Sequence, residues 1–275
     1  MKLRFRTSKP DRTPDAVMTL TEHLAELRVR IIRASLAVIL GAIVIIAFYD
    51  PIIRLMSRPY DNLCKRRGAD FCGENFSGGQ AQYLFLDPLE GLSTRLRVAM
   101  YGGIILAIPV IMWQIWRFVV PALKANEKKY AVPFIITSVV LFLLGGLLAY
   151  LTLERALEFL ISWAGEEATA AFRIQSYISL VALMLGAFGV GFQFPVLLVF
   201  LQLVGVLQPQ QLLAWWRYAI VSVVVVAAVV TPSGDPISLA ALSAPMLVLY
   251  FAAIGIGLLA QRRAARTEQA VAPSG

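Results

Sequence analysis

Long apolar stretches are the feature that most constrains how this chain can fold. Six of them lie between polar links, at residues 31–49, 98–120, 131–153, 177–204, 215–231 and 237–260. A helix needs about 17–25 residues to cross a hydrocarbon core about 30 Å thick. Because backbone polar groups find no water there, each stretch must bond internally as a helix. The sequence therefore predicts an all-α integral membrane protein with six transmembrane helices. The fifth has a short core, 218–230, so we expect it to thin the bilayer or to lie under protein cover.

Composition supports a membrane protein. Hydrophobic residues make up 59% of the chain, charged residues 15%, and the mean hydropathy is +0.72. Soluble domains have about 45–50% apolar and about 25% charged residues. The net charge of +8 indicates basic edges at the cytoplasmic side, because no polar segment is long enough to build a nucleic-acid-binding face. We expect contact with membrane lipids and no nucleic-acid partner.

Basic residues near the predicted span ends set the expected orientation. They include Arg28, Arg30 and Arg33 before the first span, Lys124, Lys128 and Lys129 after the second, and Arg262, Arg263 and Arg266 after the last. Cytoplasmic loops carry an excess of Lys and Arg, so both termini are expected on the cytoplasmic side of a plasma or inner membrane. Residues 1–18 and 261–275 are predicted to be disordered cytoplasmic tails around a membrane domain at 19–260.

The long loop at residues 51–95 is expected on the outer side. It contains Cys64 and Cys72, the two cysteines of the chain. The outer compartment is oxidising, so these residues are candidates for a disulfide, and the alternative is two free thiols. Their spacing does not resemble a zinc site, and His23 is the only histidine. We expect no metal and no cofactor.

An amphipathic segment precedes the first apolar stretch. Its apolar stripe consists of Leu20, Leu24, Leu27 and Ile31. Thr19 and Glu22 can form a capping box, and the pattern predicts an interfacial helix that runs into the first span. Glu26 lies four residues before Arg30, the favourable order for a helix ion pair. The alternative is a solvated face with local pairs and no further role.

A single carboxylate, Glu127, lies among lysines in the link after the second predicted span. It is either a surface carboxylate screened by its neighbours or a group that accepts a cationic ligand. In the fourth predicted span, Gln193 places an amide in hydrocarbon and Pro195 frees a carbonyl one turn earlier. This pair either has a function or holds the bundle through an interhelical hydrogen bond. In the turn 231–236, capping of the last span is the favoured role of Asp235.

The predicted spans lack ionisable residues in their central parts. No Asp, Glu, Lys, Arg or His lies deep within any predicted span, whereas proton-coupled carriers of small solutes usually keep ionisable groups there. The sequence shows no nucleophile–base pair, metal cluster or phosphate-binding loop. A secondary transporter remains the main alternative function and a membrane enzyme the second. We expect a protein that is not an enzyme.

Several motifs in a fixed order resemble those of the TatC family, the signal-receptor core of the twin-arginine protein translocase. They are His23-Leu-Ala-Glu-Leu-Arg28, Ile108–Phe118 followed by Pro121-Ala-Leu and Glu127, Gly191-Phe-Gln-Phe-Pro-Val196, and Thr231-Pro with Asp235. Each motif alone is weak, but together they extend from about residue 19 to 260. The chain is therefore identified as a member of this family.

The resemblance implies a cytoplasmic receptor for twin-arginine signal peptides of folded cargo proteins. Glu26 and Glu127 would meet the two arginines, Phe118 would shape the site, and Arg28 would order the first helix. Pro59 corresponds to a proline of the family's first external loop. The implied partners are TatA-like and TatB-like single-span proteins, with further copies of the chain in a receptor complex. Export would use the proton motive force.

One position departs from the family pattern. Many members carry an acidic residue where this chain has Gln193, and that residue is thought to meet a polar group of a single-span partner. An amide donates and accepts hydrogen bonds but takes up no charge. We therefore expect Gln193, beside Pro195, to be a neutral partner contact. The turn at 231–235 is one residue longer than the commonest version.

Overall fold

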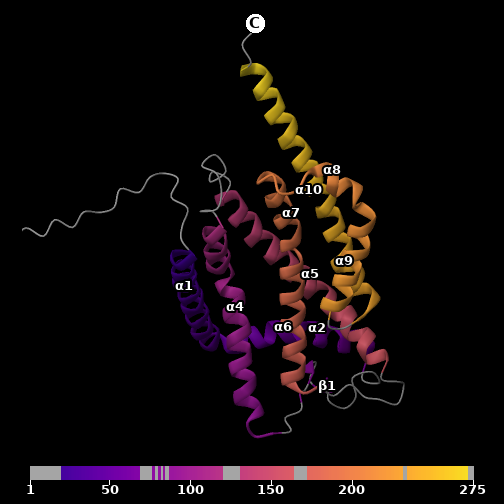
Figure 1. Ribbon diagram of the computed structural model, residues 1–275. Coiled ribbons are helices and arrows are strands. Elements are labelled where there is room, and N and C mark those ends of the chain that lie inside the picture. The colour runs from indigo at the N-terminus through magenta and orange to yellow at the C-terminus, as the bar shows by residue number, and fades with distance from the viewer. Residues whose placement is uncertain are drawn as a thin grey trace, which may run out of the picture.

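The computed structural model describes residues 20–68, 76–77, 80–81, 83, 87–119, 131–163, 172–231 and 234–271. Its helices are α1 (Leu20–Ala47), α2 (Tyr49–Arg67), α4 (Glu90–Val119), α5 (Ala131–Ser162), α6 (Ile174–Gly191), α7 (Gln193–Leu203), α8 (Pro209–Ala214), α9 (Trp216–Val230) and α10 (Pro236–Val271). The long helices alternate in direction, so that the start of α1, the end of α4 and the end of α10 lie toward the same end of the bundle (Figure 1).

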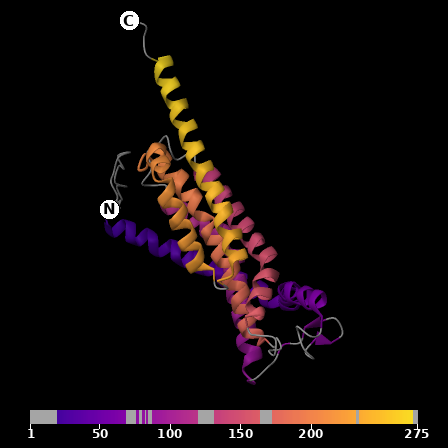
Figure 2. The same cartoon turned by 90° about the vertical axis from the view of Figure 1, so that its right-hand side faces the viewer.

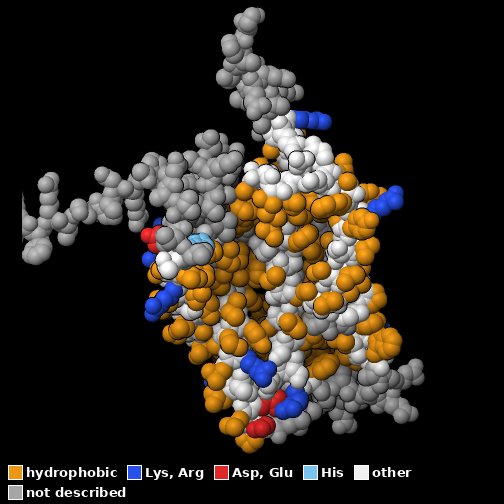
Figure 3. Space-filling model, viewed as in Figure 1, with side chains coloured by type: hydrophobic (Ala, Val, Ile, Leu, Met, Phe, Trp, Pro, Cys, Tyr) orange, Lys and Arg blue, Asp and Glu red, His pale blue; other side chains and the backbone are white. Residues whose placement is uncertain are grey.

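Five described helices are long and apolar enough to cross a membrane, which makes this a multi-pass membrane protein. These segments are Thr21–Ala47, Glu90–Phe118, Val132–Ser162, Ile174–Leu203 and Pro236–Arg262. The remaining predicted span corresponds to α9, which has 15 residues. At about 1.5 Å per residue, α9 is shorter than the hydrocarbon core. Figure 3 shows hydrophobic side chains over the middle of one face, with charged side chains toward its edges.

The amphipathic segment and the first apolar stretch form one continuous helix, α1. It packs closely against α4 because glycines face each other across the contact. A Cβ on Gly103 would lie 2.7 Å from the backbone nitrogen of Ala42, and one on Gly41 would lie 2.8 Å from the carbonyl oxygen of Gly103. This approach holds the two helices together near their middles.

The predicted outer loop is more ordered than expected, because it contains α2 and a short antiparallel pair of strands, β1 (Phe76–Ser77) and β2 (Gln80–Ala81). Sequence reasoning missed α2 because charged residues interrupt it and no stretch of span length marks it. Its buried side of Tyr60, Leu63 and Cys64 nevertheless has helical spacing. In both ribbon views α2 runs across the long helices rather than along them (Figures 1 and 2).

Hydrogen bonds and ion pairs fasten α2 to α5 and α6. The hydroxyl of Tyr177 donates to the carbonyl of Met56 at 2.6 Å, and that of Tyr150 donates to Leu55 at 2.8 Å. Glu158 of α5 pairs with Arg66 and Arg67 of α2 and with Arg155 of its own helix. Burial raises the pKa of the Tyr60 phenol to about 12, so Tyr60 is neutral at physiological pH.

Two other predicted segments differ from the structure, one because it is broken and the other because its helix is longer. The fourth predicted span is divided at Phe192 into α6 and α7, just before Pro195. Helix α10 continues to Val271, so residues 261–271 are helical rather than a disordered tail. The alanines, glutamines and arginines there are strong helix formers, which explains the continuation. The predicted tail at residues 1–18 lies outside the described residues.

Candidate functional site

The start of α1 meets the end of α4 through an aromatic contact. The ring of His23 stacks on that of Phe118 with centroids 4.3 Å apart and an interplanar angle of 24°. Phe118 is half-buried at the end of α4, directly before the link that carries Glu127. This contact places the first turns of α1 beside the end of α4.

Glu26 forms an ion pair with Arg30, as their spacing on the helix predicted. Arg30 is only 8% exposed, and its Nη1 atom donates to the backbone carbonyl of Gln114 on α4 at 3.4 Å. The pair therefore lies in the contact between the two helices and is not a solvated pair on an open face. Sequence reasoning recognised the pair but did not place Arg30 or Gln114 in the site, because their contact depends on helix packing.

Two acceptors around this pair have no hydrogen-bond partner within the described part of the chain. They are Glu26 Oε2 and Gln114 Oε1, and the Nε atom of Arg30 also lacks a partner there. Buried polar atoms normally have partners, and those that do not require an explanation. An N–H donor brought to either atom would satisfy it.

The remaining residues predicted for this site are placed unevenly. Arg28 is exposed on α1, close in sequence to Glu26. Glu127 lies outside the described residues, between the end of α4 and the start of α5. The structure thus brings Glu26 and Phe118 to one region, and the role of Glu127 stays a prediction.

Gln193 makes an interhelical hydrogen bond. Its Nε2 atom donates to the backbone carbonyl of Ser138 on α5 at 2.9 Å, and Ser138 Oγ accepts from Trp116 Nε1 on α4 at 2.9 Å. Ser138 is fully buried. The amide and Ser138 therefore link α4, α5 and α7, which is the bundle-holding role that sequence reasoning left open. Contact with a partner stays a prediction.

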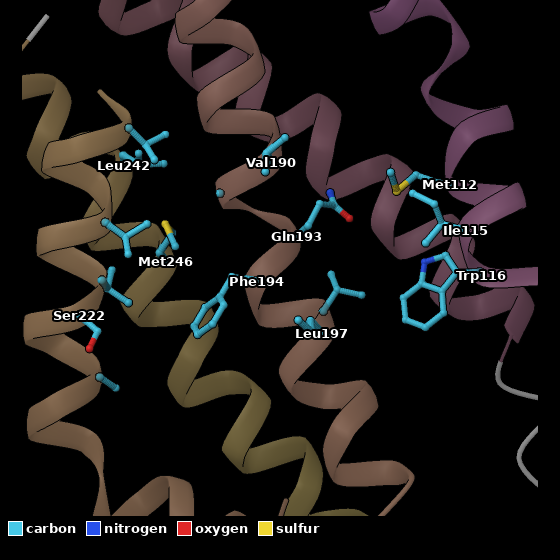
Figure 4. Close-up of a pocket in the computed structure, with 16 residues that line it drawn as sticks. Met112, Ile115, Trp116, Val190, Gln193, Phe194, Leu197, Ser222, Leu242 and Met246 are labelled. Atoms are coloured by element: carbon cyan, nitrogen blue, oxygen red, sulfur yellow. The ribbon is translucent and has the colours of Figure 1, made fainter. Parts of the chain in front are cut away.

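A groove of about 670 Å³ opens beside Gln193, between α4, the break of α6 and α7, α9 and α10. Its lining is almost entirely apolar. Figure 4 shows Gln193 extending from the break toward Met112 and Ile115, with Leu242 and Met246 on another wall. Pro195, which is buried, follows the break and cannot donate a backbone hydrogen bond. Among the residues described here, no cluster of His, Cys, Asp and Glu could hold a metal ion.

The structure also describes three further residues named from the sequence, Asp235, Pro59 and Cys64. The backbone nitrogen of Ser238 donates to Asp235 Oδ2 at 2.6 Å, the hydrogen bond that an N-cap residue makes at the start of α10. Pro59 is buried within α2. Cys64 is fully buried and is not a free thiol. Cys72 lies outside the described residues, so its pairing with Cys64 stays a prediction.

Comparisons with known proteins agree with the motif order. The family model for Sec-independent protein translocase protein (TatC) matches residues 22–245. The TatC protein of Frankia casuarinae is 36% identical over 252 residues, which cover 92% of this chain and 69% of that protein. The TatC protein of Aquifex aeolicus is 34% identical over 256 residues, covering 92% and 100%. A crystal structure of the twin arginine translocase receptor TatC has a TM-score of 0.67 at 33% identity, covering 87% and 100%.

Proposed function

Because this chain belongs to the TatC family of Sec-independent protein translocases, we propose that it is the subunit that binds twin-arginine signal peptides. Membership makes it a membrane-embedded component of a protein translocase and not an enzyme. The proposal adds the ligand, the residues that bind it and the partners.

The observation that carries the proposal is the pair of unpartnered acceptors, Glu26 Oε2 and Gln114 Oε1, beside a partly buried ion pair. A guanidinium presents several N–H donors in a planar fork, stays charged at all physiological pH values and pairs strongly with carboxylates. Phe118 supplies an aromatic surface next to this place through its stack on His23. Glu127, in the link that follows α4, would bind the second arginine, and Arg28 would order the helix.

The apolar groove beside Gln193 supports binding of a single-span partner helix of the TatA or TatB kind. The amide nitrogen of Gln193 bonds to Ser138, and its oxygen would accept a hydrogen bond from the partner. In the proposed topology α9 is the sixth span and both termini are in the cytoplasm of the inner membrane, consistent with the basic residues at those ends. Export would use the proton motive force, and several copies of the chain would form the receptor complex.

The test is a binding measurement on the full chain in lipid nanodiscs with a fluorescent twin-arginine signal peptide. Glu26→Gln and Glu127→Gln should each weaken binding about tenfold, since a charge-assisted hydrogen bond contributes roughly 1.5–3 kcal/mol. The matched control is Glu22→Gln, which removes an exposed carboxylate one turn earlier and should leave binding unchanged. Normal binding by the double variant would refute the assignment of both carboxylates.

A further inference from the structure

Arg30 is an internal guanidinium that already occupies the carboxylate assigned to the ligand. It is 8% exposed, pairs with Glu26 Oε1 and contacts the Gln114 carbonyl across the helix contact. A bound arginine peptide would bring a second guanidinium to the same carboxylate. The empty site is thus neutralised by a residue of the chain itself.

We propose that Arg30 sets the selectivity of the site, because its charge cancels that of Glu26 and leaves only hydrogen-bonding geometry to attract the ligand. This inference rests on the proposed function and adds a residue that the TatC motifs quoted above do not assign to the ligand. The other charged residues that flank the pair on α1 are Glu22, Arg28 and Arg33. All three are exposed, so water screens them more than it screens Arg30.

Neutralisation explains how arginine can be separated from lysine. With Arg30 on Oε1, the acceptors that remain are Glu26 Oε2 and Gln114 Oε1. A planar guanidinium can bond two acceptors at once, whereas an ammonium acts as a compact point charge and needs net negative charge to be attracted. A site with unpartnered acceptors but little net charge therefore favours arginine over lysine.

Removing Arg30 should restore an uncompensated carboxylate and reduce this selectivity. The variant is Arg30→Gln, which retains hydrogen-bonding capacity and loses the charge. Binding of a twin-lysine peptide should strengthen about tenfold, or about 1.4 kcal/mol, and that of a twin-arginine peptide only about threefold, or about 0.7 kcal/mol, because an unmasked carboxylate attracts the compact ammonium more. The preference for arginine should therefore fall about threefold.

The control is Arg33→Gln, which removes the same charge from an exposed position of α1 and should change both affinities by the same small factor. If Arg30→Gln weakens both peptides, Arg30 only positions Glu26 and the proposal is overturned. An unchanged arginine-to-lysine ratio overturns it as well. Glu26→Gln, measured in parallel, separates failure of the proposed binding site from failure of the proposed role of Arg30. If Glu26→Gln leaves binding unchanged, the receptor site itself is wrong, whatever Arg30 does.

Arg30→Gln leaves a partly buried carboxylate without its partner and can impair folding, so size-exclusion profiles should accompany the binding data. If that variant does not fold, Arg30→Lys takes its place. Lysine keeps the charge that offsets Glu26, so the preference for the twin-arginine peptide should stay within about twofold of that of the native chain. Loss of that preference in a folded Arg30→Lys receptor would then refute the proposal.

Discussion

At the scale of single residues, Gln193 and Ser138 show how an uncharged amide is held between helices inside the bundle. Gln193 donates a hydrogen bond to the backbone carbonyl of Ser138, so this bond does not depend on the side chain at residue 138. The Ser138 hydroxyl accepts a hydrogen bond from Trp116. The amide needs no proton uptake to make this contact. Gln193 also lines the apolar groove, where we propose that its oxygen meets the partner.

We expect Gln193→Leu to lower recruitment of a single-span partner while twin-arginine peptide binding is retained. The lost interhelical hydrogen bond should also reduce bundle stability by about 0.6–2 kcal/mol. Gln193→Glu should be tolerated, because a protonated carboxyl can donate to the Ser138 carbonyl as the amide does. Site-specific crosslinking from position 193 measures recruitment, and thermal unfolding measures stability.

Ser222→Ala is the matched control, since it changes another polar side chain of the same groove. Normal recruitment by the Leu variant, together with reduced stability, would show that Gln193 only holds the bundle.

Sequence patterns identified Glu26 and Phe118 because the motifs name them, and the Glu26–Arg30 pair because helix geometry fixes it. They could not identify Gln114 as a neighbour, since that contact joins residues 84 positions apart. An interhelical hydrogen bond of Gln193 was one of two alternatives, but its partner, Ser138, could not be named for the same reason. Long-range contacts depend on how helices approach, which periodicity does not encode.

At the scale of helices, close approach of α1 and α4 keeps Arg30, the ion-pair partner of Glu26, beside the Gln114 carbonyl. The approach requires glycine at position 103, where a Cβ would overlap the backbone of α1. The length of the apolar stretches predicted the main helices, because an apolar stretch of about 20 residues crosses a bilayer as an α-helix. It did not predict α2, whose charged residues hide a half-buried helix, or the continuation of α10 past residue 260.

Gly103→Ala should push α1 away from α4 and weaken both stability and peptide binding. Overpacking of a tight contact costs about 1–3 kcal/mol. Gly91→Ala in the same helix meets open space, and it should be neutral or stabilise by up to about 1 kcal/mol through higher helix propensity. Thermal unfolding in nanodiscs and peptide binding test both variants. Equal behaviour of the two alanine variants would contradict the close-contact explanation.

At the scale of the whole molecule, α2 packs across the predicted outer end, and the proposed ligand site lies toward the opposite end. Cys64 lies in the buried side of α2, and its predicted disulfide with Cys72 would tie the following segment to that helix. Such a bond requires an oxidising compartment, so it also tests the proposed orientation.

Denatured but unreduced protein purified from the membrane should incorporate no thiol reagent, and reduction should expose two reactive cysteines. The variant Cys72→Ser should expose Cys64 without reduction. Mass spectrometry of the labelled chain gives the count. Two labelled cysteines before reduction would exclude the disulfide.

The contacts of α2 with α5 and α6 restrict movement of these two helices at one end of the bundle. Tyr150 and Tyr177 donate hydrogen bonds to two successive carbonyls of α2, and Glu158 adds ion pairs to the same contact. Helices α5 and α6 therefore cannot separate from α2 without losing several bonds together. Movement of α5 and α6 is therefore most constrained at the end of the bundle away from His23, Glu26 and Phe118.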